Sequence, residues 1–251
     1  MARLLSSNLS TDKWKIYTLS EQHRSAFELW HRKIEKSFKG DIDMNVLAVG
    51  AHGDDIELGC GGSLAKHAIQ GDKLFIYMAT TSGGINPFGV KIRDSKESLD
   101  DAKKAAAILG AELINGSFSV NQLSFDDALN SELIKIISEK KIDLMYTHWS
   151  NDTHHDHRML ALASLHAGRH LNKILMYQSN WYQSDTSFSE NFYVDISDLW
   201  TTKEKLLNCY ESEMKRTNGA WITYNKNRAE NYGMVLGVKY AEAFQCIKWL
   251  L

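Results

Sequence analysis

Short apolar runs alternate with helix-like stretches from residue 44 onward, and this alternation constrains the fold more than any other feature. Such alternation is typical of strand–helix–strand units that build a parallel sheet. We therefore expect a single α/β domain with a Rossmann-like, doubly wound, mostly parallel sheet and helices on both faces. The expected strands are 45–51, 73–79, 111–115, 142–147 and 173–178, and the expected helices are 60–70, 94–109, 125–139 and 156–170.

Two of the expected helices carry recognisable end signals. Gly110 directly follows the helix 94–109 and is a natural C-cap, because glycine adopts the left-handed backbone conformation at little cost. Ser124-Phe-Asp-Asp127 resembles a capping box that opens the helix 125–139.

The first 40 residues are predicted to form an extension to the domain, which spans 41–251. Phe27, Trp30, Ile34 and Phe38 recur at steps of three and four, which indicates an amphipathic helix. We expect this helix to pack on the main domain or on a neighbouring subunit, so a homo-oligomer is one outcome. A helix lying on a membrane surface is the less favoured alternative, because both charge signs are mixed on its polar face.

Composition excludes several classes of protein. A formal net charge of −2 gives no electrostatic reason to expect nucleic acid as a partner. No apolar run reaches the ~20 residues needed to span a bilayer, and the first residues lack the apolar core of a secretory signal. The three cysteines are odd in number and far apart, so we expect a reduced, cytoplasmic protein that acts on a small molecule.

Two polar clusters follow two of the expected strands. Ala51-His-Gly-Asp-Asp55 comes at the end of the strand 45–51, and Asn151-Asp-Thr-His-His-Asp-His157 follows the strand 142–147. The carboxyl ends of the strands are where ligands bind in an open α/β sheet. Four of the ten histidines fall within 148–157. Together the two clusters therefore predict a site for a divalent metal.

Each cluster by itself also has a structural explanation. Aspartate is a favoured N-cap, so Asp54 or Asp55 could simply cap a helix, and a polar loop rich in histidine is often only solvated. The glycines at 59, 61 and 62 raise the question of a dinucleotide fingerprint. Two carboxylates in the preceding turn would repel a phosphate, so we expect these glycines to allow close packing of a helix on a strand.

The two clusters are similar to the two motifs of the LmbE-like, or PIG-L-type, metal-dependent N-acetylglucosaminyl deacetylases. The motifs stand here as Ala51-His-Gly-Asp-Asp-Ile-Glu-Leu-Gly-Cys-Gly-Gly62 and Asn151-Asp-Thr-His-His-Asp-His-Arg158. The similarity continues in Phe192–Ser197, Lys203–Ser212 and Gly237–Phe244, and it covers about 45–250. The prolines of both motifs are replaced here, by Gly53 and His155.

The resemblance implies a role for seven residues. It implies metal binding by His52, Asp55 and His157, proton abstraction by Asp54, oxyanion stabilisation or amine protonation by His154, orientation of a histidine by Asp156, and a substrate contact by Arg93. Two histidines and one carboxylate leave metal positions open, which is a catalytic rather than a structural arrangement. Metal-bound water can have its pKa lowered from 15.7 to roughly 7.

The implied function is a zinc-dependent hydrolase that removes the N-acetyl group from a GlcNAc-type amino sugar or its conjugate. Acetate and a free amine would form by metal-hydroxide attack, with Asp54 as the base. Zinc is expected because hydrolysis needs a Lewis acid and no redox chemistry, although Fe²⁺ or another divalent metal fits the same ligands. Two alternatives stay open: a non-haem Fe(II) oxygenase that uses the same residues, and a non-catalytic sugar-binding protein.

Aromatic and amide side chains gather in the segment 177–193. Tyr177, Asn180, Trp181 and Tyr182 could form a stacking wall for a sugar ring. An ordinary surface loop with aromatic anchors explains the same composition equally well.

Overall fold

The computed structural model describes residues 44–85 and 88–250 of the chain. The amphipathic helix expected around Phe27–Phe38 lies outside the described residues, and the division at residue 40 therefore stays a prediction. Among the described residues, none of the helices has both the length and the apolar character needed to cross a bilayer. The cytoplasmic location likewise stays a prediction.

One seven-stranded sheet forms the centre of the fold, in the order β5-β2-β1-β6-β7-β9-β8. Its strands are β1 (Asn45–Gly50), β2 (Lys73–Thr80), β5 (Glu112–Phe118), β6 (Leu144–His148), β7 (Lys173–Tyr177), β8 (Phe192–Asp195) and β9 (Ala241–Trp249). The strands β5, β2, β1, β6 and β7 run parallel to their neighbours. Strand β9 pairs antiparallel with both β7 and β8. The predicted mostly parallel sheet is confirmed.

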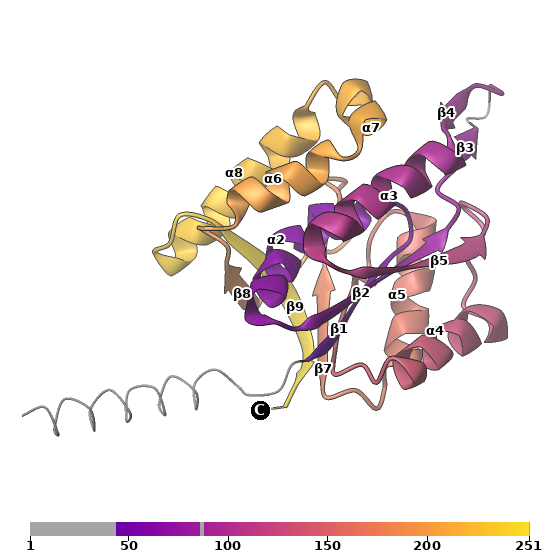
Figure 1. Cartoon of the computed structure of the whole chain (residues 1–251), viewed down its shortest axis with the longest axis horizontal. Coiled ribbons are helices and arrows are strands. Elements are labelled where there is room, and N and C mark those ends of the chain that lie inside the picture. The colour runs from indigo at the N-terminus through magenta and orange to yellow at the C-terminus, as the bar shows by residue number, and fades with distance from the viewer. Residues whose placement is uncertain (1–43, 86–87, 251) are drawn as a thin grey trace, which may run out of the picture. The chain divides into compact units, whose positions relative to one another are not determined.

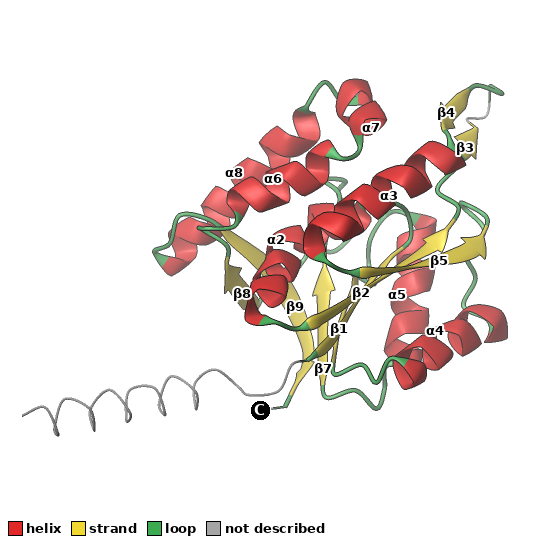
Figure 2. Ribbon diagram, viewed as in Figure 1, coloured by secondary structure: helices red, strands yellow, loops and turns green. Residues whose placement is uncertain are grey.

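Helices cover both faces of this sheet (Figure 2). The first face carries α2 (Asp55–Gln70), α3 (Ser95–Leu109) and α6 (Trp200–Asn208), and the second carries α4 (Asp127–Glu139) and α5 (His155–Ala167). Two apolar clusters form the core, one on each face, because successive residues of a strand point to opposite faces. In β1, Val46 and Ala48 belong to the first cluster, whereas Leu47 and Val49 belong to the second. The doubly wound architecture follows from this alternation.

Two more helices and a small hairpin complete the described part of the chain. They are α7 (Glu211–Arg216), α8 (Ala220–Leu236) and a small hairpin of β3 (Gly84–Ile85) and β4 (Lys91–Arg93). The helices α6, α7 and α8 follow one another on one side of the molecule in Figure 1. Helix α8 packs against β9 and buries Ala229 against Ile196, Trp200 and Tyr240.

Both predicted ends were right for α3, whereas for α4 the predicted end at Glu139 was right and the predicted start was wrong. Asp94 caps α3 by accepting hydrogen bonds from two backbone N–H groups, and Gly110 ends the helix with a left-handed φ of 65°. The capping box at Ser124 does not form. The carboxylate of Asp126 instead accepts from the backbone N–H of Leu129, and α4 starts at Asp127. Aspartate is at least as good an N-cap as serine, and Asp126 is the residue that reaches the orphan donor.

Helix α2 begins at Asp55, five residues earlier than predicted, so the three glycines lie inside it. An added Cβ on Gly59 would lie 2.1 Å from the Tyr177 ring of β7, and one on Gly62 would lie 2.8 Å from the Ile196 side chain. The expectation that these glycines allow close packing is therefore confirmed. A run of glycines suggested a turn, but burial between strand and helix keeps this stretch helical.

The helix is broken once, at Cys60, where φ is −141° and ψ is 15°. Two buried side chains satisfy the backbone groups that the break frees. Lys203 Nζ donates to the carbonyl of Leu58 at 2.9 Å. The Glu242 carboxylate accepts from the backbone N–H groups of Gly62 and Ser63 at 2.9 and 2.7 Å, as an N-cap would. Lys203 and Glu242 also pair at 2.6 Å, so the two charges compensate each other inside the protein.

We expect Gly59→Ala to destabilise the protein. Helix propensity alone would favour alanine by about 1 kcal/mol. The new methyl group, however, would collide with the buried Tyr177 ring, and overpacking of this kind typically costs about 1–3 kcal/mol. We expect a net loss of up to about 2 kcal/mol in the free energy of unfolding, measured with urea. Gly84→Ala is the matched control, because none of the residues that the structure describes lies within 4 Å of the added Cβ. Equal stability of the two variants would contradict the packing argument.

Candidate metal centre and catalytic site

The two polar clusters meet at the carboxyl edge of the sheet, as predicted. Strands β1 and β6 are neighbours and pair in parallel, with Ala48 opposite Tyr146. His52 follows β1, and Asp55 is the first residue of α2. His154 and His157 lie at the beginning of α5, which follows β6. Adjacent parallel strands thus bring residues that are far apart in the chain into contact.

The three residues implied as metal ligands point their donor atoms at one another. His52 Nδ1 lies 3.2 Å from Asp55 Oδ2. His157 Nε2 lies 3.2 Å from Asp55 Oδ1 and 3.4 Å from His52 Nδ1. Ligand atoms about 2.0–2.1 Å from a tetrahedral zinc ion lie about 3.3 Å from one another. The spacing and the chemistry of this donor set therefore fit a divalent cation.

Two further donor groups overlap with this set. His52, His154 and His157 form one, and Asp55, His148 and His157 form the other, with the donor atoms of each within 4.8 Å of one another. His157 belongs to all of these groups. It is also buried, with 4% of its surface exposed. We therefore expect any cation held here to depend on His157.

Two carboxylates lie behind the histidines. Asp156 Oδ2 is 3.0 Å from His52 Nε2, and this carboxylate also accepts from the backbone N–H groups of Asn121 and Leu123. Asp152 Oδ2 is 3.1 Å from His157 Nδ1. Carboxylates in this position fix the ring orientation of a ligand histidine and make it a stronger base. Asp156 thus has the geometry for its implied role, and Asp152 has the same geometry toward the second histidine.

The side chain of Asp54 does not cap α2, and the carboxylate of Asp55 accepts from the backbone N–H of His52, so helix capping does not explain the two aspartates of the first cluster. Asp54 occupies the position before α2, but its side chain makes no capping hydrogen bond, and its φ of 105° is strained for a residue other than glycine. Its carboxylate instead accepts from Arg93 at 2.7 Å. Arg93, at the end of β4, also lies 4.0 Å from Glu213 in α7. The resemblance implied that Arg93 contacts substrate, and the structure places it beside Asp54 on the wall of the same pocket.

His154 acts as the N-cap of α5 through Nδ1, which accepts from the backbone N–H of Asp156 at 3.2 Å. This bond requires Nδ1 to be unprotonated, so Nε2 carries the proton in the neutral ring. Burial, together with the positive charges of His157 and His52, lowers the pKa of His154 to about 4. At neutral pH the residue therefore offers one N–H donor to the pocket.

The buried charges shift one another strongly. Burial lowers the pKa of His157, but Asp55 and Asp152 outweigh this effect and raise it to about 10. Burial raises the pKa of Asp55, but His157 and His148 bring it well below its usual range. Asp55 is therefore ionised and has cationic neighbours. A divalent cation would take the place of the proton on His157, and its positive charge would balance the negative charge of the Asp55 carboxylate.

Asp54 behaves in the opposite way to Asp55. Burial raises its pKa to about 7, Arg93 opposes this shift, and the charge of Asp55 adds to it. Two adjacent carboxylates thus have separated pKa values, which is a common property of catalytic acid–base pairs.

Sequence reasoning missed His148 and Asp152. His148 ends β6, is fully buried, and places Nε2 3.3 Å from Asp55 Oδ2. Its ring stacks on that of His157, with centroids 3.9 Å apart. The concentration of histidines in 148–157 could have pointed to His148. His148 was left without a role because the family motif begins only at Asn151. Asp152 lies inside that motif and was left without a role.

Local contacts explain why glycine and histidine are suited to positions 53 and 155, where the family motifs have proline. The backbone N–H of Gly53 donates to Ser82 Oγ at 2.7 Å, a bond that proline could not make. Gly53 also lies close to Ser98, since an added Cβ would approach its Oγ to 2.8 Å. His155 Nε2 lies 2.8 Å from the carbonyl oxygen of Leu123, so its ring fixes the loop before α4.

A pocket of about 190 Å³ contains the donor atoms. It is lined by His52, Asp54, Asp55, Leu58, Arg93, His154, His157, Ser179, Asn180, Trp181, Tyr182, Arg216 and Trp221. Three members of the predicted stacking wall are therefore present: Asn180, Trp181 and Tyr182. Tyr177 was predicted wrongly. It is fully buried in β7 and donates its hydroxyl to the carbonyl of Val49.

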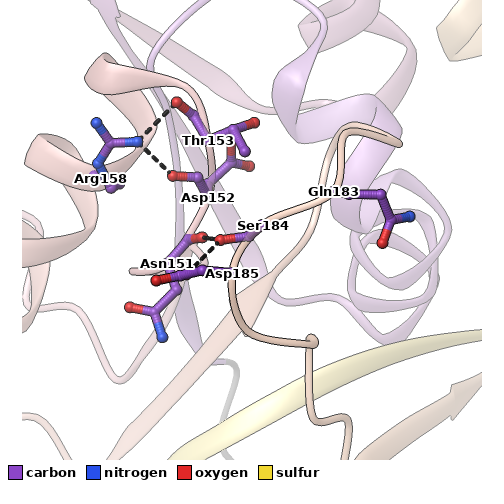
Figure 3. Close-up of a pocket in the computed structure, with 7 residues that line it drawn as sticks. All are labelled: Asn151, Asp152, Thr153, Arg158, Gln183, Ser184 and Asp185. Atoms are coloured by element: carbon purple, nitrogen blue, oxygen red, sulfur yellow. Dashed lines mark hydrogen bonds between the residues drawn. The ribbon is translucent and has the colours of Figure 1, made fainter.

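A larger hollow of about 430 Å³ adjoins the histidine-rich loop (Figure 3). Arg158 there donates to the backbone carbonyls of Asp152 and Thr153, and Ser184 donates to that of Asn151. These bonds hold the loop in place. The described residues that line this hollow include no histidine, so we assign the chemistry to the smaller pocket.

Comparisons with known proteins agree with this site. The family described as "PIG-L: GlcNAc-PI de-N-acetylase" matches residues 47–168, which contain both clusters. The uncharacterized deacetylase YaiS of Escherichia coli is 36% identical over 169 residues, which cover 62% of this chain and 84% of that protein. The diacetylchitobiose deacetylase of Thermococcus kodakarensis is 25% identical over 229 residues, which cover 80% of this chain and 82% of that protein.

The fold has a solved counterpart. The conserved protein TT1542 of Thermus thermophilus superposes with a TM-score of 0.70 at 23% identity, over 83% of this chain and 96% of that one. The fold and the two clusters define an α/β enzyme of the deacetylase class. The chain belongs to the PIG-L, or LmbE-like, family of deacetylases.

We expect purified protein to carry about one divalent ion per chain, because a single constellation of two histidines and a carboxylate binds one metal. His157→Ala should lose most of this metal, since His157 belongs to every donor group described above. The metal content is measured by elemental analysis after gel filtration. His166→Ala is the matched control, because this histidine lies exposed on the same helix. A His157→Ala protein as fully loaded as the control would show that the ligand assignment is wrong.

Proposed function

We propose that this protein is a metal-dependent N-deacetylase that removes the acetyl group from a GlcNAc-type amino sugar or its conjugate. One observation carries the proposal. Asp54 is a buried carboxylate that makes no helix cap and lies directly beside a donor set suited to a divalent cation. Membership of a deacetylase family and the 25% identity to a diacetylchitobiose deacetylase support the same reaction. Zinc is the proposed metal, because this reaction needs a Lewis acid and no redox change.

The chain's own residues have complementary parts in this reaction. His52, Asp55 and His157 would hold the cation, which supplies a Lewis acid and lowers the pKa of a water molecule. Asp54 accepts the proton of the water as the oxygen adds to the acetamide carbon. His154 donates its Nε2–H to the carbonyl oxygen as negative charge develops there. The proton on Asp54 then passes to the departing nitrogen as the C–N bond breaks, which gives acetate and a free amine.

The two-histidine-one-carboxylate set is also the ligand set of Fe(II) oxygenases, and this is the second candidate. Such an enzyme has no use for a free carboxylate beside the metal ligand, so Asp54 favours hydrolysis. The two reactions are separated by measuring acetate release and oxygen consumption on a panel of N-acetylhexosamines and their glycosides, with Zn²⁺ or Fe²⁺ added. Acetate without oxygen uptake supports the deacetylase. Substrate-dependent oxygen uptake would support the oxygenase, and sugar binding with neither product would indicate a non-catalytic protein.

The two neighbouring aspartates should respond differently to the same substitution. Asp54→Asn removes the base but keeps the shape of the side chain, so kcat should fall by about 10²–10⁴-fold at full metal occupancy. Asp55→Asn weakens a metal ligand, so metal affinity should fall first and excess metal should restore part of the activity. Both are measured as metal content and acetate release on the same preparations. The opposite result is that Asp54→Asn loses the metal, whereas Asp55→Asn keeps full metal occupancy and has a lower kcat. This result would show that the two roles are reversed.

The rate should depend on pH through Asp54. Its pKa is raised to about 7, and only the ionised carboxylate accepts a proton, so kcat should fall as the pH decreases through and below this value. A bound cation opposes this shift and lowers the pKa of Asp54, so the falling limb of the metal-loaded enzyme should lie at a lower pH. Arg93 also lowers it, so Arg93→Met should move the falling limb to higher pH. The measurement is a pH–rate profile beside that of Arg169→Met, an exposed arginine beyond the far end of α5. An unmoved limb in Arg93→Met would exclude Asp54 as the titrating group.

A further inference from the structure

The loop after β7 contacts the donor set at two points, although it lies outside both polar clusters. Ser179 Oγ donates to Asp55 Oδ1 at 3.2 Å. The amide of Asn180 donates to the carboxylate of Asp152, which in turn lies 3.1 Å from His157 Nδ1. A third strand end thus reaches the site. Its side chains contact one implied metal ligand directly and a second one through a carboxylate.

The contact between Asn180 and Asp152 has a defined geometry. Asn180 Nδ2 lies 2.9 Å from each of the two carboxylate oxygens of Asp152. A carboxylate ion can only accept hydrogen bonds, so the NH₂ group of the amide must face it. The carbonyl oxygen of the same amide accepts from the backbone N–H of Tyr182 at 3.0 Å. Both ends of the amide are therefore held, and its orientation is fixed.

Asp152 depends on such donors because it is buried, with 2% of its surface exposed. The backbone N–H of His154 donates to Oδ1 at 2.8 Å, and the His157 ring lies beside Oδ2. A buried carboxylate that loses a donor is left partly uncompensated. Without the amide of Asn180, each oxygen would have one close partner fewer, and the plane of the carboxylate would no longer be fixed.

His157 requires a fixed carboxylate at Nδ1 because its other ring nitrogen faces the donor set. Nε2 lies 3.2 Å from Asp55 Oδ1. A neutral histidine binds a metal through its unprotonated nitrogen, so ligation through Nε2 requires the proton on Nδ1. A carboxylate beside Nδ1 holds this tautomer and the ring orientation. The position of Asp152 therefore decides how well His157 can bind a cation.

We propose that Asn180 is a positioning residue for the metal ligand His157 and that it acts through Asp152. The inference rests on the metal site of the proposed function, but it does not rest on the reaction. Asn180 also lines the pocket, so a contact with substrate alone is the competing role. A positioning residue changes metal affinity in the absence of substrate, whereas a substrate contact changes only KM.

The test measures the dissociation constant of Zn²⁺ by competition with a chelator, on the full chain without substrate. Asn180→Ala removes the amide, so this constant should rise by about 10–100-fold, as is typical when a partner behind a metal ligand is lost. Asn180→Leu also removes the amide but keeps most of the side-chain volume, and it should have the same effect. Gln183→Ala is the matched control, because it removes an exposed amide from the same loop and should bind zinc like the parent.

A double-mutant cycle tests whether Asn180 acts through Asp152. In the Asp152→Ala background, Asn180→Ala should have little further effect on zinc affinity, because two residues that act through one contact are not additive. Urea unfolding of the metal-free proteins shows whether each variant is folded, and Asn180→Leu replaces Asn180→Ala in the cycle if the smaller side chain prevents folding. The same loss of affinity in both backgrounds would overturn the route through Asp152.

The remaining outcomes separate this inference from the proposed function. Zinc affinity in Asn180→Ala equal to that of the control, with KM raised or unchanged, would overturn the positioning role and leave the proposed function intact. Weaker zinc binding that depends on Asp152, without acetate release by the parent, would keep the positioning role and overturn the proposed reaction. Failure of the parent to bind zinc would overturn both.

Discussion

The buried carboxylate of Asp55 is the interaction on which the site depends. A carboxylate removed from water is costly unless charges and hydrogen bonds compensate it. Here nitrogen atoms of His52, His148 and His157 lie within 3.2–3.3 Å of its oxygens, and the backbone N–H of His52 donates to it. These partners come from the loop after β1, from the end of β6 and from α5. The charge of Asp55 is therefore compensated only while the carboxyl ends of β1 and β6 and the start of α5 keep their relative positions.

A second constraint holds the helix that begins with Asp55. Helix α2 is broken at Cys60, and Lys203 and Glu242 provide the missing donor and acceptor from α6 and β9. Both side chains are nearly fully buried and pair with each other. Removing one of them would leave a buried charge and unsatisfied backbone groups together. The C-terminal third of the chain therefore supports the motif near its start, although it contributes none of the three implied metal ligands.

Local chemistry explains which features were predictable. Five strands of the large sheet were predicted within a few residues because their apolar runs are continuous, whereas β8 and β9 were not predicted. Both ends of α3 lie within one residue of the prediction, because Asp94 and Gly110 act within one turn of their own positions. The start of α2 was missed because glycine propensity favours a turn, whereas packing against Tyr177 and Ile196 requires residues without a Cβ in a helix. Tyr177 was assigned to the pocket because composition does not show which face of a strand a residue occupies.

The sequence by itself determined the α/β class, the family and the two clusters, because periodicity and motif spacing are properties of the chain. Only the tertiary structure decided which atoms face one another. It brought His148 to Asp55 and Arg93 to Asp54, and it joined Trp181 to Trp221 across the pocket. These contacts link residues 39 or more positions apart, and no local pattern encodes them. They arise because the order of strands in the sheet, and the packing of helices on it, fix which loops share an edge.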